Sequence, residues 1–462
     1  MYQIDFNKPI HVHFIGIGGS NMSGLAELLH TRHFIVSGSD ENKNDACAKL
    51  EGLGISVRYG QSAAGITPDI DLVVYTAAVH PDNPEYVAAK KAGIPMLNRA
   101  EFLGELMLQY KEAIGIAGTH GKTTTSSMLS MILIEAGMDP TISIGSVLEP
   151  IHSNSRTGHS DYFVVESCEY TNSFLQFHPR HEIILNIEAE HLDFFRDLDD
   201  IRNSFRLFME KLDEGGNLVI QGDIEGLSSL VAGVKAKITT FGIASAGKTY
   251  DYSAANITWD KNGCGRYDLM HENDVIAHIT LGVVGAHNVS NSVAAAAMAD
   301  LFGVPLTTIA HALRCFGGAK KRFEKKGEFH GVTIIDDYAH HPTEIRATLA
   351  AAEHYPHRDV WCVFQPHTFS RTKLLLDDFA DALSRADKVI LSDIYPSREK
   401  DPGDISSRDL MRKLEEKGRE VYYFPDFEEI EKFLLENCIH GDLLITMGAG
   451  DIVKVADALL KK

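Results

Sequence analysis

Long apolar runs and paired cysteines are both missing from this 462-residue chain. No segment approaches the ~18 apolar residues that a membrane-spanning helix needs, and residues 1–10 lack the basic stretch and apolar core of a signal peptide. The six cysteines form no CxxC pair and no zinc-like spacing. We therefore expect a cytoplasmic protein with no membrane partner, whose cysteines are reduced packing residues.

Positive charge is also scarce. Lys and Arg number 44 against 64 Asp and Glu, which gives a formal net charge of −20. This charge favours solubility and argues against a nucleic-acid or anionic membrane surface, so we expect no nucleic-acid partner. An anionic substrate then needs local basic clusters. The sequence offers two, Lys320–Arg322 and Arg371 with Lys373.

The length is too great for one hydrophobic core and suggests roughly three domains of about 150 residues. Hydrophobic residues make up 44% and charged residues 23%, which is ordinary for a globular protein. Short apolar runs alternate with helical patterns along most of the chain, so we expect an α/β protein. We place the domains at residues 1–107, 108–318 and 319–462, with Gly317 and Gly318 as a hinge.

The stretch around residue 118 organises the chain. Ala113–Ala117 is a short apolar run typical of a buried parallel strand, Gly118–Gly121 is a tight polar loop, and Ser126–Ala136 carries apolar residues at helical spacing. Strand, glycine loop and helix form a phosphate cradle, because loop N–H groups close around phosphate oxygens and the helix N-terminus adds partial positive charge.

Lys122 and Thr123 follow this loop directly. In a phosphate loop the lysine reaches the terminal phosphates and the threonine hydroxyl ligates Mg²⁺. The sequence departs from the standard G-x-x-x-x-G-K-[ST] pattern, since Ile116 stands where the first glycine is expected. A Gly-Lys-Thr tripeptide can also be a plain turn at a helix start, but the flanking strand and helix favour an ATP site.

Residues 11–40 form a second glycine-rich unit. A predicted strand at His11–Ile15, a loop at Gly16–Gly24 and a strand at Phe34–Ser37 ending near Asp40 match a Rossmann unit. The third glycine of the dinucleotide fingerprint is replaced by Asn21. A nucleotide diphosphate is therefore favoured over NAD.

Acidic and imidazole side chains follow two predicted strands of the central domain. Glu166 comes after the strand Asp161–Val165, and His191 lies just past the strand His181–Ile187. Ligands gather at the carboxyl ends of parallel strands, so both can meet the Lys122 loop and ligate Mg²⁺. The alternative is that each is an ordinary polar residue at a strand end.

Three further segments carry chemically useful residues. Asn288 and Asn291 precede an Ala-rich helix predicted at Val293–Leu301, where they are either helix caps or amides for a purine edge. In the third domain, residues 336–342 read Asp-Asp-Tyr-Ala-His-His-Pro and residues 365–371 read Gln-Pro-His-Thr-Phe-Ser-Arg. Both segments follow predicted strands, Val332–Ile335 and Val360–Phe364, which is where a site is expected.

Four motifs in this order resemble the Mur ligase family along essentially the whole chain. They are Gly-Thr-His-Gly-Lys-Thr-Thr-Thr at 118–125, Asn-Ile-Glu-Ala-Glu-His-Leu-Asp at 186–193, Gly-Ala-His-Asn-Val-Ser-Asn at 285–291, and the residues at 336–342. The loop at Gly16–Gly24 is similar to that of the alanine-adding branch, where it holds the UDP of a sugar substrate.

The resemblance implies an ATP-dependent amide ligase of peptidoglycan synthesis. The lactyl carboxylate of UDP-N-acetylmuramate would attack the γ-phosphate of ATP, and the amine of L-alanine would then attack the resulting acyl phosphate. The implied fold has an N-terminal Rossmann-like UDP-binding domain, a central P-loop-type ATPase domain with a mostly parallel sheet, and a C-terminal Rossmann-like domain that closes over the site and binds the amino acid. The implied cofactors are ATP and Mg²⁺.

The resemblance also implies roles for individual residues. Catalytic roles fall to Lys122, His191, His341 and Arg371. The ATP-binding set is Gly118, Thr119, His120, Gly121, Lys122, Thr123, Thr124, His287, Asn288, Asn291, Arg322 and Asp337. The UDP-sugar set is Gly16, Gly18, Gly19, Ser20, Met22, Ser23, Ser39, Asp40 and His80. The amino-acid set is Tyr338, His340, His341 and Arg371. The metal ligands are Thr123, Glu166 and His191, with His191 on a second Mg²⁺.

The chain departs from the family at several positions, among them Glu190 and Leu192 beside His191, where Asp and Met are commoner. Residues 166–171 read Glu-Ser-Cys-Glu-Tyr-Thr where Glu-Ala-Asp-Glu-Ser-Asp is common, which keeps Glu166 and Glu169. Sibling ligases carry a carbamylated lysine where Arg206 stands here, so we expect no carbamate. Three alternatives remain: a sibling ligase that adds a peptide or another amino acid, a dinucleotide-dependent oxidoreductase, and a non-catalytic nucleotide-gated binding protein. We expect a monomer or a homodimer.

Overall fold

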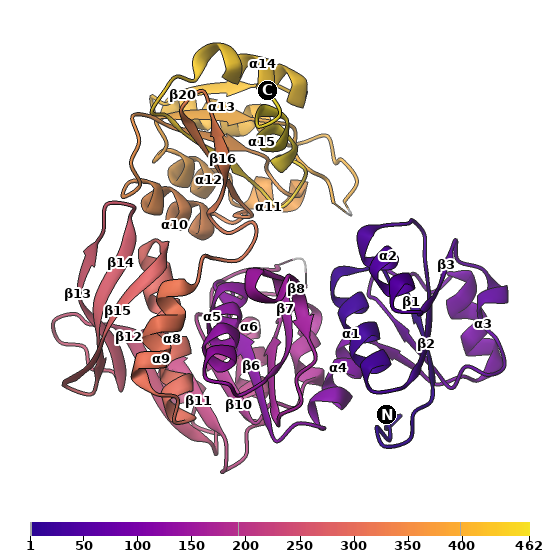
Figure 1. The fold of residues 1–462 in the computed structure, drawn as a ribbon. Coiled ribbons are helices and arrows are strands. Elements are labelled where there is room, and N and C mark those ends of the chain that lie inside the picture. Colours follow the sequence, from indigo (N-terminus) through magenta and orange to yellow (C-terminus); the bar gives the residue numbers. More distant parts are fainter. Residues whose placement is uncertain (1, 193, 398) are drawn as a thin grey trace. The chain divides into compact units, whose positions relative to one another are not determined.

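The computed structural model describes residues 2–192, 194–397 and 399–462 (Figure 1). Asp193, the last residue of the motif at 186–193, lies outside the described residues. The chain divides into two compact units. The first comprises residues 1–253, 270–274 and 291–312, and the second comprises residues 254–269, 275–290 and 313–462. Within the described ranges, no helix is both long enough and apolar enough to cross a bilayer.

The N-terminal sheet has five parallel strands in the order β3-β2-β1-β4-β5. They are β1 (His11–Ile15), β2 (Ile35–Asp40), β3 (Ser56–Tyr59), β4 (Leu72–Tyr75) and β5 (Met96–Asn98). The helices are α1 (Ser20–Thr31), α2 (Asp45–Gly52), α3 (Pro84–Ala92) and α4 (Arg99–Met107). The strand order reverses next to β1, and ligands of such sheets bind at that switch point. The Rossmann-like prediction is confirmed.

Seven strands of the first unit form the central sheet in the order β12-β11-β10-β6-β9-β7-β8. They are β6 (Glu112–Ala117), β7 (Thr141–Leu148), β8 (Ser153–Arg156), β9 (Tyr162–Glu166), β10 (His181–Ile184), β11 (Asn217–Gln221) and β12 (Lys237–Ile243). All neighbouring strands pair in parallel except β7 with β8, which agrees with the predicted, mostly parallel sheet. The strand predicted at His181–Ile187 ends earlier, because Asn186 turns to contact the phosphate loop.

The helices that follow are α5 (Lys122–Glu135), α6 (Leu198–Met209), α7 (Leu227–Leu230), α8 (Ala286–Leu301) and α9 (Leu306–Cys315). Three short 3₁₀ turns occur at Ala63–Gly65, Glu149–Ile151 and Tyr170–Gln176. The strands β13 (Tyr252–Trp259), β14 (Cys264–His271) and β15 (Asp274–Val284) are sheet neighbours in the order β15-β14-β13. The helix predicted to begin at Val293 begins at Ala286, two turns earlier.

The C-terminal sheet has the order β16-β17-β21-β18-β19-β20. Its strands are β16 (Glu324–Phe329), β17 (Val332–Asp337), β18 (Val360–Phe364), β19 (Lys388–Leu391), β20 (Glu420–Tyr423) and β21 (Leu443–Met447). Its helices are α10 (Pro342–Ala352), α11 (Phe369–Leu374), α12 (Leu376–Leu383), α13 (Ser407–Glu416), α14 (Phe427–Asn437) and α15 (Val453–Leu459). Only the edge strand β16 is antiparallel.

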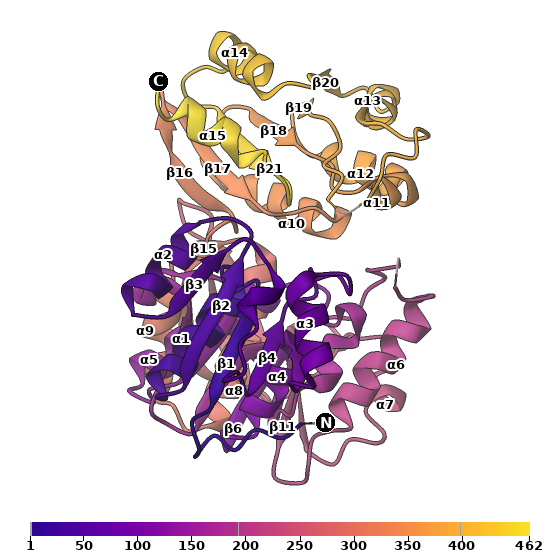
Figure 2. The same cartoon turned by 90° about the vertical axis from the view of Figure 1, so that its right-hand side faces the viewer.

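Both faces of the C-terminal sheet are buried (Figure 2). Every residue of β18 is buried, and alternate residues belong to different cores. Cys362 and Phe364 pack with α10, α12 and α13, while Trp361 and Val363 pack with α14 and α15. This is why the strand reads as a continuous apolar run rather than an alternating one. The predicted α/β class with parallel-dominated sheets is confirmed.

Candidate active site

The phosphate loop joins β6 to α5 through two glycines in left-handed conformations. Gly118 has φ 144° and Gly121 has φ 84°. A Cβ at Gly121 would lie 2.6 Å from Oδ1 of Asn291, and a Cβ at Gly118 would lie 3.0 Å from Cβ of Leu185. Both positions therefore exclude larger residues. Asn291, predicted for the ATP site, does lie beside the loop.

The segment after β10 holds this loop in place. Asn186 accepts a hydrogen bond from His120 N through Oδ1 at 2.8 Å and donates Nδ2 to His120 O at 3.0 Å. The backbone N–H of Glu188 donates to the Thr119 hydroxyl at 2.9 Å. Asn186 and Glu188 were not predicted as site residues. The motif at 186–193 was the signal for them, but only the fold shows that they brace the loop.

Lys122 lies folded against its own loop. Its Nζ donates to the carbonyl oxygens of Gly118 and Thr119 and, at 2.9 Å, to Oε2 of Glu169. Its side chain is 13% exposed and that of Glu169 is 2% exposed. Burial by itself lowers the pKa of Lys122, but the neighbouring acidic groups, chiefly the carboxylate of Glu169, together outweigh it and the net pKa is raised. The lysine therefore carries its positive charge at any physiological pH.

Thr123 and Glu166 meet at the start of α5, as predicted. The Thr123 hydroxyl donates to Oε1 of Glu166 at 3.1 Å, and the backbone N–H of Gly145 donates to Oε2 at 2.7 Å. A Cβ at Gly145 would lie 2.6 Å from that carboxylate, so the glycine leaves the room that the Glu166 side chain occupies. A hydroxyl and a carboxylate at a phosphate loop are hard oxygen donors of the kind Mg²⁺ prefers.

His191 lies next to Glu169. Its Nε2 is 4.0 Å from Oε1 of Glu169, its φ is 55°, and its ring packs against Tyr170 with centroids 4.4 Å apart. Glu169 was noted in the sequence but not predicted as a site residue, because only the fold shows that it contacts both Lys122 and His191. Arg206 pairs with Glu210 and Asn203 along α6.

The residues expected at the adenine have different surroundings. Since α8 begins at Ala286, Asn288 lies inside the first turn rather than at a cap, and its Nδ2 donates to Val284 O at 2.8 Å. The prediction that the two asparagines could cap a helix starting near Val293 is therefore wrong. Burial lowers the pKa of His287 to about 4, so its imidazole is neutral.

Asp337 and Arg322 stabilise the segment that enters the C-terminal sheet. Asp337 accepts backbone N–H groups of Phe323 at 2.7 Å and Ala339 at 2.8 Å. Burial raises the pKa of Asp337 to about 6. The guanidinium of Arg322 lies 3.4 Å from Oε1 of Glu344 and 5.6 Å from the ring centroid of Tyr338. Arg322 and Asp337, both predicted for the ATP site, therefore stabilise the segment that leads into this sheet.

The residues predicted for the amino acid are clustered at the carboxyl ends of β17 and β18. Nδ1 of His340 lies 3.3 Å from Oε2 of Glu344, and the His340 ring lies 5.7 Å from that of His367. Arg371 contacts Nδ1 of His367 at 3.1 Å. His341 caps α10, because its Nδ1 accepts the N–H of Thr343. Glu344 and His367 were not predicted, although both lie within or next to the quoted motifs.

The glycine loop of the N-terminal sheet approaches β2 closely. The N–H of Gly18 donates to Oδ2 of Asp40 at 2.9 Å, and a Cβ there would lie 2.5 Å from Sγ of Cys47. The Ser39 hydroxyl donates to the buried carboxylate of Glu85. Met22 is 2% exposed and belongs to the hydrophobic core. The remaining predicted UDP-sugar residues lie on the loop or at the start of α1, except the exposed His80; they are Gly16, Gly19, Ser20 and Ser23.

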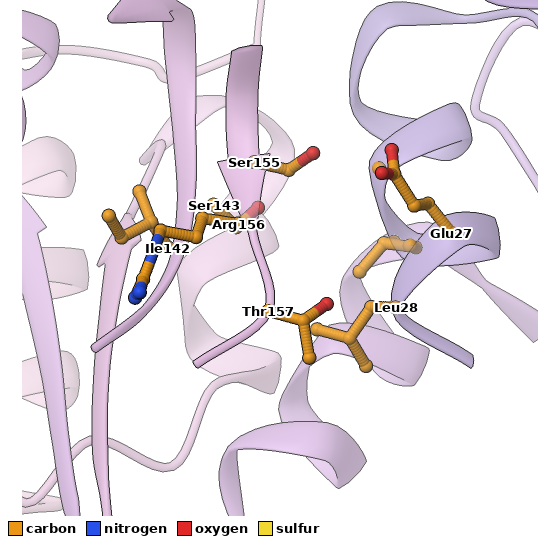
Figure 3. Close-up of a pocket in the computed structure, with 9 residues that line it drawn as sticks. Glu27, Leu28, Ile142, Ser143, Ser155, Arg156 and Thr157 are labelled. Carbon is orange, nitrogen blue, oxygen red and sulfur yellow. The ribbon is translucent and has the colours of Figure 1, made fainter. Parts of the chain in front are cut away.

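A small pocket lies between α1 and the β7–β8 hairpin (Figure 3). Gly24 allows this approach, because a Cβ there would lie 2.5 Å from Oγ of Ser155. Asn154 of the same hairpin donates to Ser20 O at 3.1 Å and to Oδ1 of Asn21 at 3.2 Å. The hairpin therefore contacts the start of the glycine loop's helix.

Three α/β sheets, a phosphate loop with a buried lysine and an adjacent hydroxyl–carboxylate pair define a nucleotide-dependent α/β enzyme. Three family profiles match the chain: "Mur ligase family, catalytic domain" at residues 11–111, "Mur ligase middle domain" at 116–299 and "Mur ligase, glutamate ligase domain" at 321–450. The chain belongs to the Mur ligase family.

Relatives and solved structures agree with this assignment. The chain is 56% identical to the UDP-N-acetylmuramate--L-alanine ligase of Lachnoclostridium phytofermentans and 57% identical to that of Agathobacter rectalis, in each case over 100% of both chains. It is similar to the crystal structure of UDP-N-acetylmuramate-alanine ligase MurC from Thermotoga maritima, with a TM-score of 0.82, 28% identity and 98% of each chain covered. A murein peptide ligase from Psychrobacter arcticus has a TM-score of 0.71 and 26% identity over 98% of each chain.

Proposed function

We propose that this chain is an ATP-dependent ligase that joins L-alanine to the lactyl carboxylate of UDP-N-acetylmuramate. The observation that carries the proposal is the full-length identity of 56–58% to three relatives with that name. The carboxylate attacks the γ-phosphate of ATP, which gives an acyl phosphate and ADP. The amine of L-alanine then attacks the acyl carbon, and phosphate leaves. This is a cytoplasmic step of peptidoglycan synthesis.

The phosphate loop supports the first half of this reaction. A carboxylate and an ammonium do not condense in water, so the carboxylate must first become a good electrophile. Phosphoryl transfer between two anions depends on positioning and charge neutralisation. Lys122 supplies a permanent positive charge at this loop, and the N-terminus of α5 adds a partial one. Gly118, Thr119, His120, Gly121 and Thr124 line the same cradle.

The donor set at the start of α5 fits Mg²⁺. Thr123 and Glu166 would hold one ion, and His191 would hold a second. Bound Mg²⁺ would neutralise the negative charge of the phosphate groups during transfer. The buried side chains around the phosphate loop also exclude water, which protects an acyl phosphate from hydrolysis.

We assign the domains to the substrates as follows. Residues 1–107 bind the UDP-sugar through the glycine loop and Asp40, residues 108–318 bind ATP, and residues 319–462 bind the amino acid and close over the site. Arg322 and Asp337 would join the ATP site on closure. Asn288, with His287 and Asn291 beside it, would contact the adenine. Tyr338, His340, His341 and Arg371 would contact L-alanine and the reacting carboxylate. We expect a monomer or a homodimer.

The experiment that tests this function measures ADP release with Mg-ATP and UDP-N-acetylmuramate, with and without L-alanine, and with glycine, D-alanine or a short peptide in its place. ADP release that requires both the UDP-sugar and L-alanine supports the proposal. ADP release that requires a peptide instead would favour the second candidate, a peptide-adding sibling. That candidate is supported by the likeness to the Psychrobacter arcticus murein peptide ligase.

A further inference from the structure

Glu169 is the buried carboxylate of the site that the proposed function does not use. It lies three residues after the end of β9 and immediately before the 3₁₀ turn Tyr170–Gln176. Its Oε2 pairs with Lys122 at 2.9 Å. Its Oε1 is buried and accepts no hydrogen bond from the described residues. An unsatisfied oxygen on a fully buried carboxylate is rare in folded proteins and calls for a physical reason.

The free oxygen is directed towards an imidazole. Oε1 lies 4.0 Å from Nε2 of His191, too far for a hydrogen bond. Two ligand bonds of about 2.1 Å to one ion span at most about 4.2 Å, so a single divalent cation fits between the two atoms. A carboxylate oxygen and an imidazole nitrogen are both ordinary ligands for such an ion.

The pairing with Lys122 suggests why this oxygen is left open. Nζ of Lys122 is held by two loop carbonyl groups and by Glu169. To reach the terminal phosphates of a nucleotide, Nζ must turn away from these partners. Glu169 then loses the ammonium group that pairs with its Oε2 while remaining 2% exposed, and a buried carboxylate without a counter-ion is strongly unfavourable. A second cation at Oε1 would compensate that charge.

We propose that Glu169 is a ligand of a second divalent cation together with His191, beside the ion held by Thr123 and Glu166. Glu169 pairs with Lys122 in the structure; when a nucleotide binds, Lys122 pairs with the phosphates and Glu169 pairs with the cation. This inference rests on the proposed function, since it needs a nucleotide at the loop. It adds a ligand that the sequence did not assign.

The test counts Mn²⁺ ions by electron paramagnetic resonance. The full chain is titrated with Mn²⁺ in the presence of a non-hydrolysable ATP analogue and UDP-N-acetylmuramate. We expect two ions per chain for the wild type and one for Glu169→Gln. The matched control is Glu182→Gln, which also replaces a buried carboxylate, but one that lies within β10, outside the phosphate loop, and accepts no hydrogen bond from the described residues. The control is expected to keep two ions.

Three further results decide the proposal. Two ions bound with unchanged affinity in Glu169→Gln, or only one ion in the wild type, would overturn it. If Glu169→Gln fails to fold, Glu169→Asp replaces it; this variant keeps the carboxylate but shortens its reach, so we expect the second ion to bind at least about tenfold more weakly, and unchanged affinity overturns the proposal. Failure of the wild type to bind the ATP analogue at all would instead refute the proposed function.

Discussion

Removing the positive charge of Lys122 should abolish turnover. It should also destabilise the fold, because Lys122 pairs with the buried carboxylate of Glu169. In Lys122→Met, the apolar stem of the side chain is largely kept and the ammonium is lost. Glu169, which is 2% exposed, then loses the ammonium group that pairs with it. Breaking a buried pair by removing one partner typically costs about 3–5 kcal/mol of folding stability. The loss of transition-state stabilisation should lower kcat by at least about a hundredfold to a thousandfold.

The two effects can be separated with a double variant. Lys122→Met combined with Glu169→Gln removes both charges, so most of the lost stability should return while turnover stays abolished. Stability is measured by urea unfolding and turnover by ADP release, with UDP-N-acetylmuramate binding by calorimetry as the control. Binding of the UDP-sugar should be nearly unchanged in folded variants, because its glycine loop belongs to another sheet. Restored turnover in the double variant, or no loss of stability in the single one, would refute this reasoning.

Three other changes test separate parts of the structure. Burial raises the pKa of Glu182 well above its usual value, so the carboxyl form stabilises the fold at low pH and this stability is lost as pH rises above about 4.5. Glu182→Gln should therefore gain stability relative to wild type with increasing pH, by up to about 1.4 kcal/mol per pH unit in urea unfolding. A stability difference that does not depend on pH would contradict this prediction. His191→Ala should raise the Mg²⁺ concentration needed for half-maximal ADP release, and an unchanged Mg²⁺ titration would remove it from the metal site. Gly121→Ala, at φ 84° and 2.6 Å from Asn291, should cost at least about 1 kcal/mol and weaken ATP binding, which calorimetry would show; wild-type affinity would refute the strained-loop argument.

The sequence predicted the interior strands well and the edge strands poorly. β18 has the predicted bounds because an interior parallel strand is buried on both faces and reads as an apolar run. β16, which reads Glu-Lys-Lys-Gly-Glu-Phe, and β8, which reads Ser-Asn-Ser-Arg, were not predicted. Both are edge strands of their sheets, where charged and polar residues discourage pairing with other chains. Their sequences therefore carry little strand signal.

The residues of the candidate site were also predicted only in part. Lys122, Thr123 and Glu166 were predicted from one loop and one strand end, and the structure brings them together. Glu169 and Asn186 were not predicted as site residues. Their contacts join segments about 50 to 70 residues apart along the chain, and no local pattern encodes such a distance. Motif resemblance identified the segments, whereas the individual contacts required the fold.

The most direct test of the central claim follows one oxygen atom. If the lactyl carboxylate of UDP-N-acetylmuramate attacks the γ-phosphate of ATP, one carboxylate oxygen leaves with the phosphate when the amine of L-alanine attacks. With the carboxylate labelled with ¹⁸O, mass spectrometry should find one ¹⁸O atom in each inorganic phosphate released, in step with formation of the alanyl product. Unlabelled phosphate, or label in the nucleotide product, would contradict an acyl-phosphate ligase.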